Sequence, residues 1–306
     1  MSKLSIWHMS NIGLLLLIAF LWASAFGAMK VAVVETGPLS LAAIRASIAS
    51  VILLCLLRMK GPIPWRFLIE YFPHFLIVGG LGTALPFVLL PWAELRIDSS
   101  LAGLLMSVGP LATMAGAWLF GLERDLNMKR VLGIFIGLAG TMVIFAQGFA
   151  SLGQGYLGAQ FVAVGASLCY VAGNLMVRRL DMIAPFVIAT LAMTLAACLL
   201  VPMAIILEQP TPLQWSAQSW QMLLWLGLMP TALAFSVRYY LIARAGASFT
   251  SYVGYLIPAI AMLLGALLLD EVITLDKLLA LGLILTGLLF AQQQGPSPSR
   301  APIQEK

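Results

Sequence analysis

The sequence predicts an all-α integral membrane protein of ten transmembrane helices, arranged as two five-helix repeats of inverted topology. Three observations carry this prediction: an apolar composition, ten long apolar runs, and a similarity between the two halves of the chain. Hydrophobic residues make up 61% of the 306 residues and charged residues only 9%, with a mean hydropathy of +1.00. Soluble domains carry about 25% charged residues, so this chain could not cover a water-facing surface.

The apolar runs have the length of a helix that crosses a bilayer, which is about 20 residues. Helix is favoured over strand because a helix satisfies its own backbone groups, and the alternating pattern of a barrel strand does not occur. Breaks rich in Gly, Pro or charge separate the runs, such as ETGPLS and GLERDLN. We expect spans at residues 11–34, 39–58, 72–94, 99–121, 128–147, 156–177, 185–207, 218–242, 247–269 and 276–293.

A short phrase occurs once in each half of the chain. TALPF at Thr83–Phe87 returns as TALAF at Thr231–Phe235, an offset of 148 residues. At this offset, without a gap, 11 of the 47 positions between Thr83 and Lys129 are identical, against roughly four expected by chance. We therefore expect a first repeat at 1–150, a second at 151–294, and a disordered cytoplasmic tail at 295–306, which is polar and Pro-rich.

The N-terminal segment has two readings. LLLLIAFLWASA follows a short basic start and ends near Ala23-x-Ala25, which resembles a signal peptide with its cleavage site. At the offset of 148, however, Trp22 aligns with Tyr170 of the sixth span. Cleavage would leave the first repeat one helix short, so we expect the segment to be retained as the first span.

The basic residues predict the orientation. With the N-terminus inside, 12 Lys and Arg residues fall in cytoplasmic segments, three fall outside (Lys30, Arg96, Lys277), and Arg45 and Arg238 lie within spans. This positive-inside bias predicts a multi-pass protein of the plasma membrane, of the bacterial inner-membrane type, with both termini cytoplasmic. The net charge of +5 follows from this topology, so no nucleic-acid partner is expected. Because five is odd, the second repeat is inverted, which is the geometry of alternating access and indicates transport of a small-molecule substrate across the lipid bilayer.

Several motifs then resemble one known family. LWASAFGAMK (Leu21–Lys30) carries W-x-S-x-F, and Pro110/Glu123 and Pro258/Glu271 repeat a mid-helix proline followed 13 residues later by Glu and a Gly-rich helix. Arg45 lies in the second span, in LAAIRAS. Over about residues 10–292 the chain resembles EamA-type members of the drug/metabolite transporter superfamily. The resemblance implies ten helices and a central cavity that exports small metabolites, often amino acids or amphiphiles, without naming one.

The first and sixth spans offer candidate substrate-binding residues. Trp22, Phe26 and Lys30 share one helix face, as do their counterparts Tyr170, Asn174 and Arg178. If the two spans face each other, Trp22, Phe26, Tyr170 and Asn174 line a cavity; the alternative is that the rings belong to the core or the lipid belt. Asn174 is the most informative, because an amide in mid-span needs a polar partner or water.

Arg45 is a further candidate for substrate binding. An arginine in mid-membrane costs about 2.5–3.5 kcal/mol on insertion scales, so it rarely faces lipid. Its guanidinium could receive a substrate carboxylate bidentately, or it could form a structural ion pair or reach the outer surface. Its repeat counterpart is Met193, so its role is not duplicated. Arg238 is expected to extend to the inner surface instead.

Pro110 and Pro258 are expected hinges, because each proline frees a carbonyl one turn upstream for a hydroxyl or water. The remaining candidates for substrate binding lie on the fourth, eighth and ninth spans: Ser107, Tyr239, Tyr252 and Tyr255. Glycines of the fifth and tenth spans predict close packing between these two spans, or between two protomers of a homodimer: Gly133, Gly137, Gly140, Gly282 and Gly287.

The chemistry-bearing residues argue against catalysis. No HExxH, paired acid or Ser/His couple stands within a span, no cysteine spacing suits a metal, and no GxxxxGK[ST] loop is present, so neither an enzyme nor a cofactor is expected. Glu123 and Glu271 end their spans and are read as caps or loop contacts. Glu94, at the outer end of the third span, is the acid nearest to the membrane, which leaves proton coupling, exchange and facilitated diffusion open.

The best interpretation is a secondary exporter of small metabolites such as amino acids. A carrier or flippase of lipid-linked or nucleotide-linked sugars shares this architecture and is the main alternative. An intramembrane enzyme and a channel are further alternatives, but the sequence shows neither catalytic sets nor filter-like segments.

Overall fold

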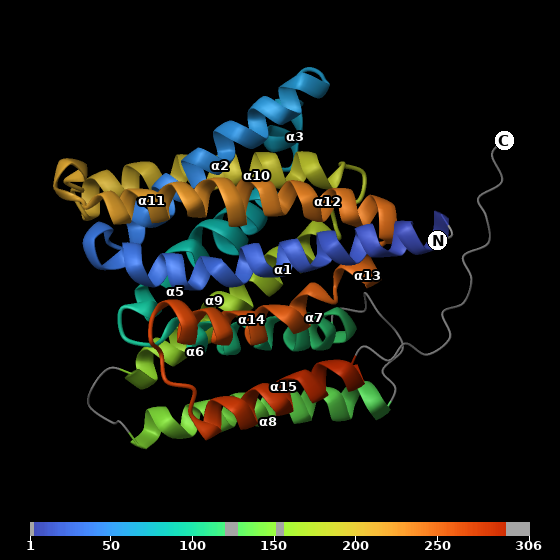
Figure 1. The fold of residues 1–306 in the computed structure, drawn as a ribbon. Coiled ribbons are helices and arrows are strands. Elements are labelled where there is room, and N and C mark those ends of the chain that lie inside the picture. Colours follow the sequence, from blue (N-terminus) through green and yellow to red (C-terminus); the bar gives the residue numbers. More distant parts are fainter. Residues whose placement is uncertain (1–2, 120–127, 151–155, 292–306) are drawn as a thin grey trace.

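The computed structural model describes residues 3–119, 128–150 and 156–291, and its regular elements in these ranges are all helices (Figure 1). Within these ranges, eight helical segments are long and apolar enough to cross a membrane. The last two predicted spans are shorter helices, with 16 residues in Val253–Leu268 and 17 in Leu275–Ala291. The chain is therefore an all-helical, multi-pass membrane protein. The predicted tail at 295–306 lies outside the described residues.

Each predicted span corresponds to one helix or to a few consecutive helices. Spans one to five are α1 (Lys3–Thr36), α2 (Pro38–Lys60), the series α4 (Phe72–Phe75), η1 (Leu76–Ala84) and α5 (Leu85–Glu94), the pair α6 (Ser99–Met106) and α7 (Val108–Leu119), and α8 (Met128–Ala150). Spans six to ten are α9 (Tyr156–Val177), α10 (Pro185–Leu207), the series α11 (Ala217–Leu226), η3 (Gly227–Leu233) and α12 (Ala234–Ala245), the pair α13 (Ala247–Thr250) and α14 (Val253–Leu268), and α15 (Leu275–Ala291). Two short helices lie in connections, α3 (Trp65–Glu70) and η2 (Pro212–Gln214).

The contacts between helices repeat when each helix is exchanged for its counterpart in the other half. α1 packs against α14, and its counterpart α9 packs against α6 and α7. α1 also packs against α11 and α12, as α9 does against η1 and α5. α2 and α10 pack against each other, and so do α8 and α15. This pattern is that of two repeats related by a two-fold axis, and five spans in each repeat place that axis in the plane of the membrane.

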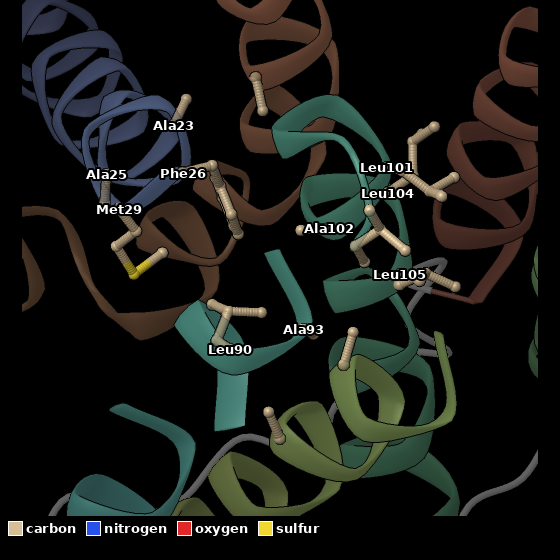
Figure 2. Close-up of a cluster of buried hydrophobic side chains, with 14 of the residues drawn as sticks. Ala23, Ala25, Phe26, Met29, Leu90, Ala93, Leu101, Ala102, Leu104 and Leu105 are labelled. Atoms are coloured by element: carbon tan, nitrogen blue, oxygen red, sulfur yellow. The ribbon is translucent and has the colours of Figure 1, made fainter. Parts of the chain in front are cut away.

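The largest cluster of buried apolar side chains connects the two repeats. Figure 2 shows part of it, with Phe26 and Met29 of α1, Leu90 of α5, and Leu101 and Leu105 of α6. The cluster continues onto α14 and α15 of the second repeat. Many of its members are alanines, so helices approach closely there. Without a hydrophobic force between helices in lipid, such close packing is a main source of helix association.

α8 and α15 lie side by side at one edge of the bundle and meet through glycines (Figure 1). A Cβ atom added to Gly133 would lie 2.5 Å from Gly287 O and from Ala291 N, and one added to Gly140 would lie 2.9 Å from Ala280 O. A Cβ on Gly287 would collide with the backbone of Gly137. The glycine pattern thus serves packing between spans five and ten of one chain, the first of the two readings above. A homodimer stays a prediction.

Gly287→Ala should destabilise the protein, because the added methyl would force α8 and α15 apart. Overpacking of this kind costs about 1–3 kcal/mol. Gly282→Ala on the same helix is the matched control, since nothing lies within 4 Å of the added Cβ and alanine is the better helix former by about 1 kcal/mol. We expect a lower melting temperature in detergent for Gly287→Ala and an unchanged or higher one for Gly282→Ala. Equal effects would contradict this packing.

Candidate functional site

Both copies of the repeated phrase lie at π-helical segments. Thr83 stands in η1 and Thr231 in η3, and each hydroxyl donates to the carbonyl five residues earlier. The distances are 2.8 Å from Thr83 Oγ1 to Val78 O and 2.7 Å from Thr231 Oγ1 to Leu226 O. A π segment disturbs the regular backbone bonding and is frequent at functional sites. In each irregular segment the threonine hydroxyl bonds one backbone carbonyl, and this shared role accounts for the recurrence of the threonine.

Arg45 of α2 reaches this point of the second repeat. Its Nε donates to Thr231 Oγ1 at 2.8 Å, its Nη1 lies 3.4 Å from the sulfur of Met29, and its guanidinium stands 4.1 Å from the centre of the Phe87 ring. The side chain is only 6% exposed. Among the described residues its contacts are thus a hydroxyl, a thioether and a ring, rather than the carboxylate of a structural ion pair. Hydrogen bonding to a hydroxyl and stacking on a ring both orient the planar guanidinium.

Trp22 and Tyr170 approach the same region from different helices. Trp22 Nε1 donates to Pro230 O of η3 at 3.0 Å, and its ring meets the Phe235 ring edge to face, with 6.0 Å between centres. Tyr170 packs against the cluster that contains Phe87 and lies within electrostatic range of Arg45. Trp22, Arg45 and Tyr170 therefore gather around η3. Trp22 contacts the eighth span, whereas the expected cavity had it opposite the sixth.

At one end of the bundle, three carboxylates at or just after the end of one helix each cap the start of a different helix and so close this end. We call it the carboxylate end. Glu35 accepts hydrogen bonds from Ser216 N and Ser219 Oγ, before and in α11. Glu208 accepts from Leu39 N, Ser40 N and Ser40 Oγ in α2. Glu271 accepts from the backbone N of Ser99 and Ser100 in α6, at 2.7 and 2.9 Å. Negative charge at a helix N-terminus is stabilising, so these contacts hold six helix ends together. The predicted capping role of Glu271 fits this geometry, while Glu123 lies outside the described residues.

An ion pair adds to this closure. The Nζ of Lys277 in α15 lies 2.8 Å from Asp98 Oδ2 and also donates to Ser100 Oγ and Val272 O. Its side chain is buried, and all three partners stand at or beside α6 and the turn before α15. The carboxylate end is thus fixed by charged groups in both repeats.

One face of the sixth span is buried at mid-helix, at Ser167, and exposed further from the carboxylate end, at Asn174. Ser167 is fully buried, and its Oγ donates to Met106 O at 3.0 Å. Asn174 lies two turns further along α9, on the same face and roughly 40° around the helix from Tyr170. Asn174 is exposed, although it lies on the same face of α9 as the buried Ser167. This face of α9 therefore opens toward the end of the bundle opposite the carboxylate end.

The expected hinge at Pro110 coincides with a break in the fourth span. α6 ends at Met106 and α7 begins at Val108. Pro110 cannot donate to Met106 O, and Ser167 of α9 satisfies this carbonyl instead. Ser107 itself is buried and donates only to Gly103 O, at 3.5 Å within its own helix.

The ninth span is interrupted before its proline as well, between Thr250 and Val253, so its main helix begins later than residue 247. Tyr255 is 9% exposed, and its hydroxyl donates to Leu288 O of α15 at 2.6 Å, which ties α14 to α15. Tyr252 is exposed and its ring lies between those of Phe249 and Tyr255. The structure thus places Tyr255, like Phe26 and Ser107, in the packed core, and leaves Tyr252 accessible.

Tyr239 of α12 meets Phe186 of α10 edge to face, with 6.2 Å between ring centres. Arg238 beside it stands 5.7 Å from the Trp22 ring. These rings lie beyond η3, away from the carboxylate end. Aromatic side chains and Asn174 therefore lie between η3 and that opposite end.

Sequence reasoning missed several residues that the geometry brings to this region: Met29, Phe87, Pro230, Thr231 and Phe235. The signal was present, because four of them, all except Met29, stand in the two repeated phrases or directly before one. The phrase aligns the two repeats, and its threonine also bonds a backbone carbonyl in each irregular segment.

Comparison with known proteins identifies similar chains. The model of the EamA-like transporter family matches residues 9–146 and again residues 155–292. The two matches cover the two repeats separately and nearly the whole chain.

Curated relatives and a solved structure extend this similarity. An uncharacterized transporter of Archaeoglobus fulgidus is 26% identical over 87% of this chain and 93% of its own length. The uncharacterized inner membrane transporter YedA of Escherichia coli K12 is 25% identical over 91% and 89%. A probable terminal-alkyne amino-acid exporter of Streptantibioticus cattleyicolor is 26% identical over 84% and 85%. One crystal structure shares the fold with a TM-score of 0.67 at 18% identity, covering 92% of this chain and 97% of the other.

Thr231→Val should destabilise the protein more than Thr83→Val. The first change removes the partners of both Leu226 O and Arg45 Nε, whereas the second removes only the partner of Val78 O. A buried group without a partner costs about 1–3 kcal/mol, and more when it is charged. The melting temperatures of the two purified variants measure the difference, and equal losses would argue against the Arg45 contact.

Proposed function

Because the chain belongs to the EamA-like transporter family, we propose that it is a secondary exporter of small metabolites, amino acids or related amphiphilic molecules, by alternating access. The observation that carries the proposal furthest is the difference between the two ends of the bundle. Three carboxylates and a buried ion pair close one end, while Asn174 is exposed on the inner face of α9 toward the other. Two repeats of opposite orientation can exchange these states around a fixed site.

The positive-inside bias assigns the carboxylate end to the outside. The conformation described here is then closed outward and accessible from the cytoplasm, the state in which an exporter loads its substrate. The localisation proposed is the bacterial-type inner membrane, in keeping with the printed name of the relative YedA.

The substrate class follows from the chemistry around η3. Arg45 offers a guanidinium to a carboxylate, the rings of Trp22, Tyr170 and Tyr239 offer apolar surface, and Asn174 offers an amide. A small molecule with one carboxylate and an apolar part fits this set. The relative from Streptantibioticus cattleyicolor, named a probable amino-acid exporter, supports the same class.

The test is flux in liposomes that contain the purified full-length protein. We expect efflux of a labelled apolar amino acid from loaded liposomes, at least several-fold above protein-free liposomes, and weaker efflux of sugars and nucleotides. A panel in which nucleotide sugars move and amino acids do not would replace the proposal with the sugar-carrier alternative.

Both termini should be cytoplasmic. α1 begins and α15 ends at the same end of the bundle, opposite the carboxylate end (Figure 1). A tag at either terminus should be accessible to protease or antibody only after the cells are opened. Access from outside intact cells would reverse the orientation and the proposed direction of loading.

Asn174→Leu should lower flux roughly two- to tenfold at unchanged stability. The change removes one exposed amide, and a neutral hydrogen bond is worth about 0.5–1.5 kcal/mol. Phe161→Leu is the control, because Phe161 is 58% exposed on the opposite face of α9. Flux at the wild-type level in Asn174→Leu would remove this residue from the substrate path.

Arg45→Lys should weaken transport of substrates that carry a carboxylate by about tenfold or more, since hydrogen bonds to charged groups are worth about 1.5–3 kcal/mol. Lysine keeps the charge but lacks the planar fork. A substrate without a carboxylate should be affected less. Expression, melting temperature and flux of both substrates are measured for Arg45→Lys and Arg45→Ala. A uniform loss that follows stability would show that Arg45 is structural.

A further inference from the structure

Glu94 differs from every other carboxylate described at its end of the bundle. It ends α5, its exposure is 0%, and neither carboxyl oxygen has a hydrogen-bond partner among the described residues. Glu35, Glu208 and Glu271 each accept at least two hydrogen bonds. Buried polar groups in proteins are nearly always bonded, so this exception requires an explanation.

The described charged groups around Glu94 bond atoms other than its carboxyl oxygens. Lys30 of α1 donates to the backbone carbonyls of Glu94 and Ile97, at 2.6 and 2.8 Å, and so caps the end of α5. Arg45 of α2 is bonded to Thr231. Glu271, after α14, is bonded to the start of α6. Lys30, Arg45 and Glu271 all act on Glu94 electrostatically, yet none of them bonds its carboxyl oxygens.

The other elements packed against α5 supply no alternative partner. η1 and α6 contain no charged residue, and Asp98 before α6 is paired with Lys277. The titratable side chains of α9 are Tyr156, Cys169 and Tyr170. Glu94 is thus fully buried, and the two cations that act on it electrostatically donate their hydrogen bonds to other acceptors.

Two physical effects make an ionised carboxylate unfavourable in this position. A buried charge without hydrogen bonds loses its hydration and gains nothing in return. In addition, the C-terminal end of a helix carries partial negative charge, which repels a carboxylate there. A neutral carboxylic acid avoids both.

We propose that Glu94 is a proton-binding site that senses the state of the carboxylate end, holding a proton when this end is closed and releasing it when the end opens. The inference rests on the alternating access proposed above. On opening, water reaches the carboxyl group, its O–H bond breaks and the proton passes to the water on that side. The carboxylate can then pair with Lys30, which now donates to the backbone carbonyls of Glu94 and Ile97, or with Arg45, which now donates to Thr231. On closing, one proton is taken up from the same side.

The sign of the effect follows from this exchange. Because closing takes up a proton, acid on this side favours the closed state, by at most about tenfold per pH unit for one proton. The capping carboxylates would act in the opposite direction, because their protonation removes hydrogen bonds that hold this end closed. Since the proton returns to the side from which it came, Glu94 regulates opening and does not itself carry a proton across.

The experiment measures opening without a substrate. Ile97 is fully buried beside Glu94, so Ile97→Cys, in a chain whose three native cysteines are replaced by alanine, reports opening through its reaction with a membrane-impermeant thiol reagent. Labelling rates are measured in liposomes as the pH on the carboxylate-end side is varied. The same rates are measured with Glu94→Gln, and dividing by them removes the pH dependence of the thiol itself. Glu208→Gln is the control, because it neutralises another carboxylate at the same end.

We compare the labelling rate of Ile97→Cys in the protein that keeps Glu94 with its rate in the protein that carries Glu94→Gln. The ratio of the first rate to the second should rise severalfold to about tenfold for each unit of increasing pH, over part of the pH range. Glu208→Gln should keep this dependence, and pH on the other side should not matter. A ratio that stays flat, or that rises toward acid, overturns the proposal.

Infrared difference spectra of the protein in lipid provide a second readout that does not depend on the cysteine. A carbonyl stretch of a protonated, poorly bonded carboxylic acid should disappear as pH rises, should be missing in Glu94→Gln and should be shifted in Glu94→Asp. If Glu94→Gln does not fold, the carbonyl band of the wild-type protein and its shift in Glu94→Asp still test the proposal. The absence of this band from the wild-type spectrum overturns it. If the amino-acid panel shows no flux, the proposed function fails, while both readouts still test Glu94.

Discussion

Inside a bilayer every backbone amide and carbonyl needs a partner within the protein, and this requirement governs where the bundle can depart from regular helix. The third, fourth and eighth spans are all irregular, yet their disturbed carbonyls are bonded by side-chain hydroxyls: Val78 O by Thr83, Leu226 O by Thr231, and Met106 O by Ser167. The last of these hydroxyls comes from a different span. Thr231 in turn accepts a hydrogen bond from Arg45 of the second span. Two of these irregular points are therefore also points at which different spans are bonded to each other.

The two repeats share their packing but differ in their charged residues. The counterparts of Arg45, Glu94 and Glu208 are Met193, Ile242 and Lys60, whereas the counterpart of Glu271 is again a glutamate, Glu123. Only part of the charged set at the carboxylate end is therefore repeated in the other half of the sequence. Because the two repeats share their backbone arrangement, the bundle open at one end and the bundle open at the other end are alike in shape. Different side chains at equivalent positions make the two states unequal in free energy, which lets one of them dominate in the absence of substrate.

The fold was accessible from the sequence because its determinants are local or repetitive. Apolar runs gave the spans, prolines located the breaks of the fourth and ninth helices, and glycines of the fifth and tenth spans marked their contact. The arrangement around η3 was harder to predict. Trp22 bonds Pro230 across 208 positions of sequence, and Arg45 bonds Thr231 across 186, and no periodicity encodes such pairs. Ser107 and Tyr255 are equivalent at the offset of 148 residues, and both were expected to bind substrate. Their hydroxyls instead donate to backbone carbonyls, that of Ser107 within its own helix and that of Tyr255 to α15.

A cation held in mid-membrane also has an electrical consequence. Arg45 is bonded to a hydroxyl, a thioether and a ring, so within the described structure its positive charge is not cancelled by a bonded anion. When the repeats exchange their open ends, this charge changes the aqueous compartment to which it is connected, although it hardly moves. Transferring one elementary charge through the field is worth about 2.3 kcal/mol per 100 mV. An empty carrier of this design would feel the membrane potential, whereas one loaded with a carboxylate would carry a neutral pair and feel it far less.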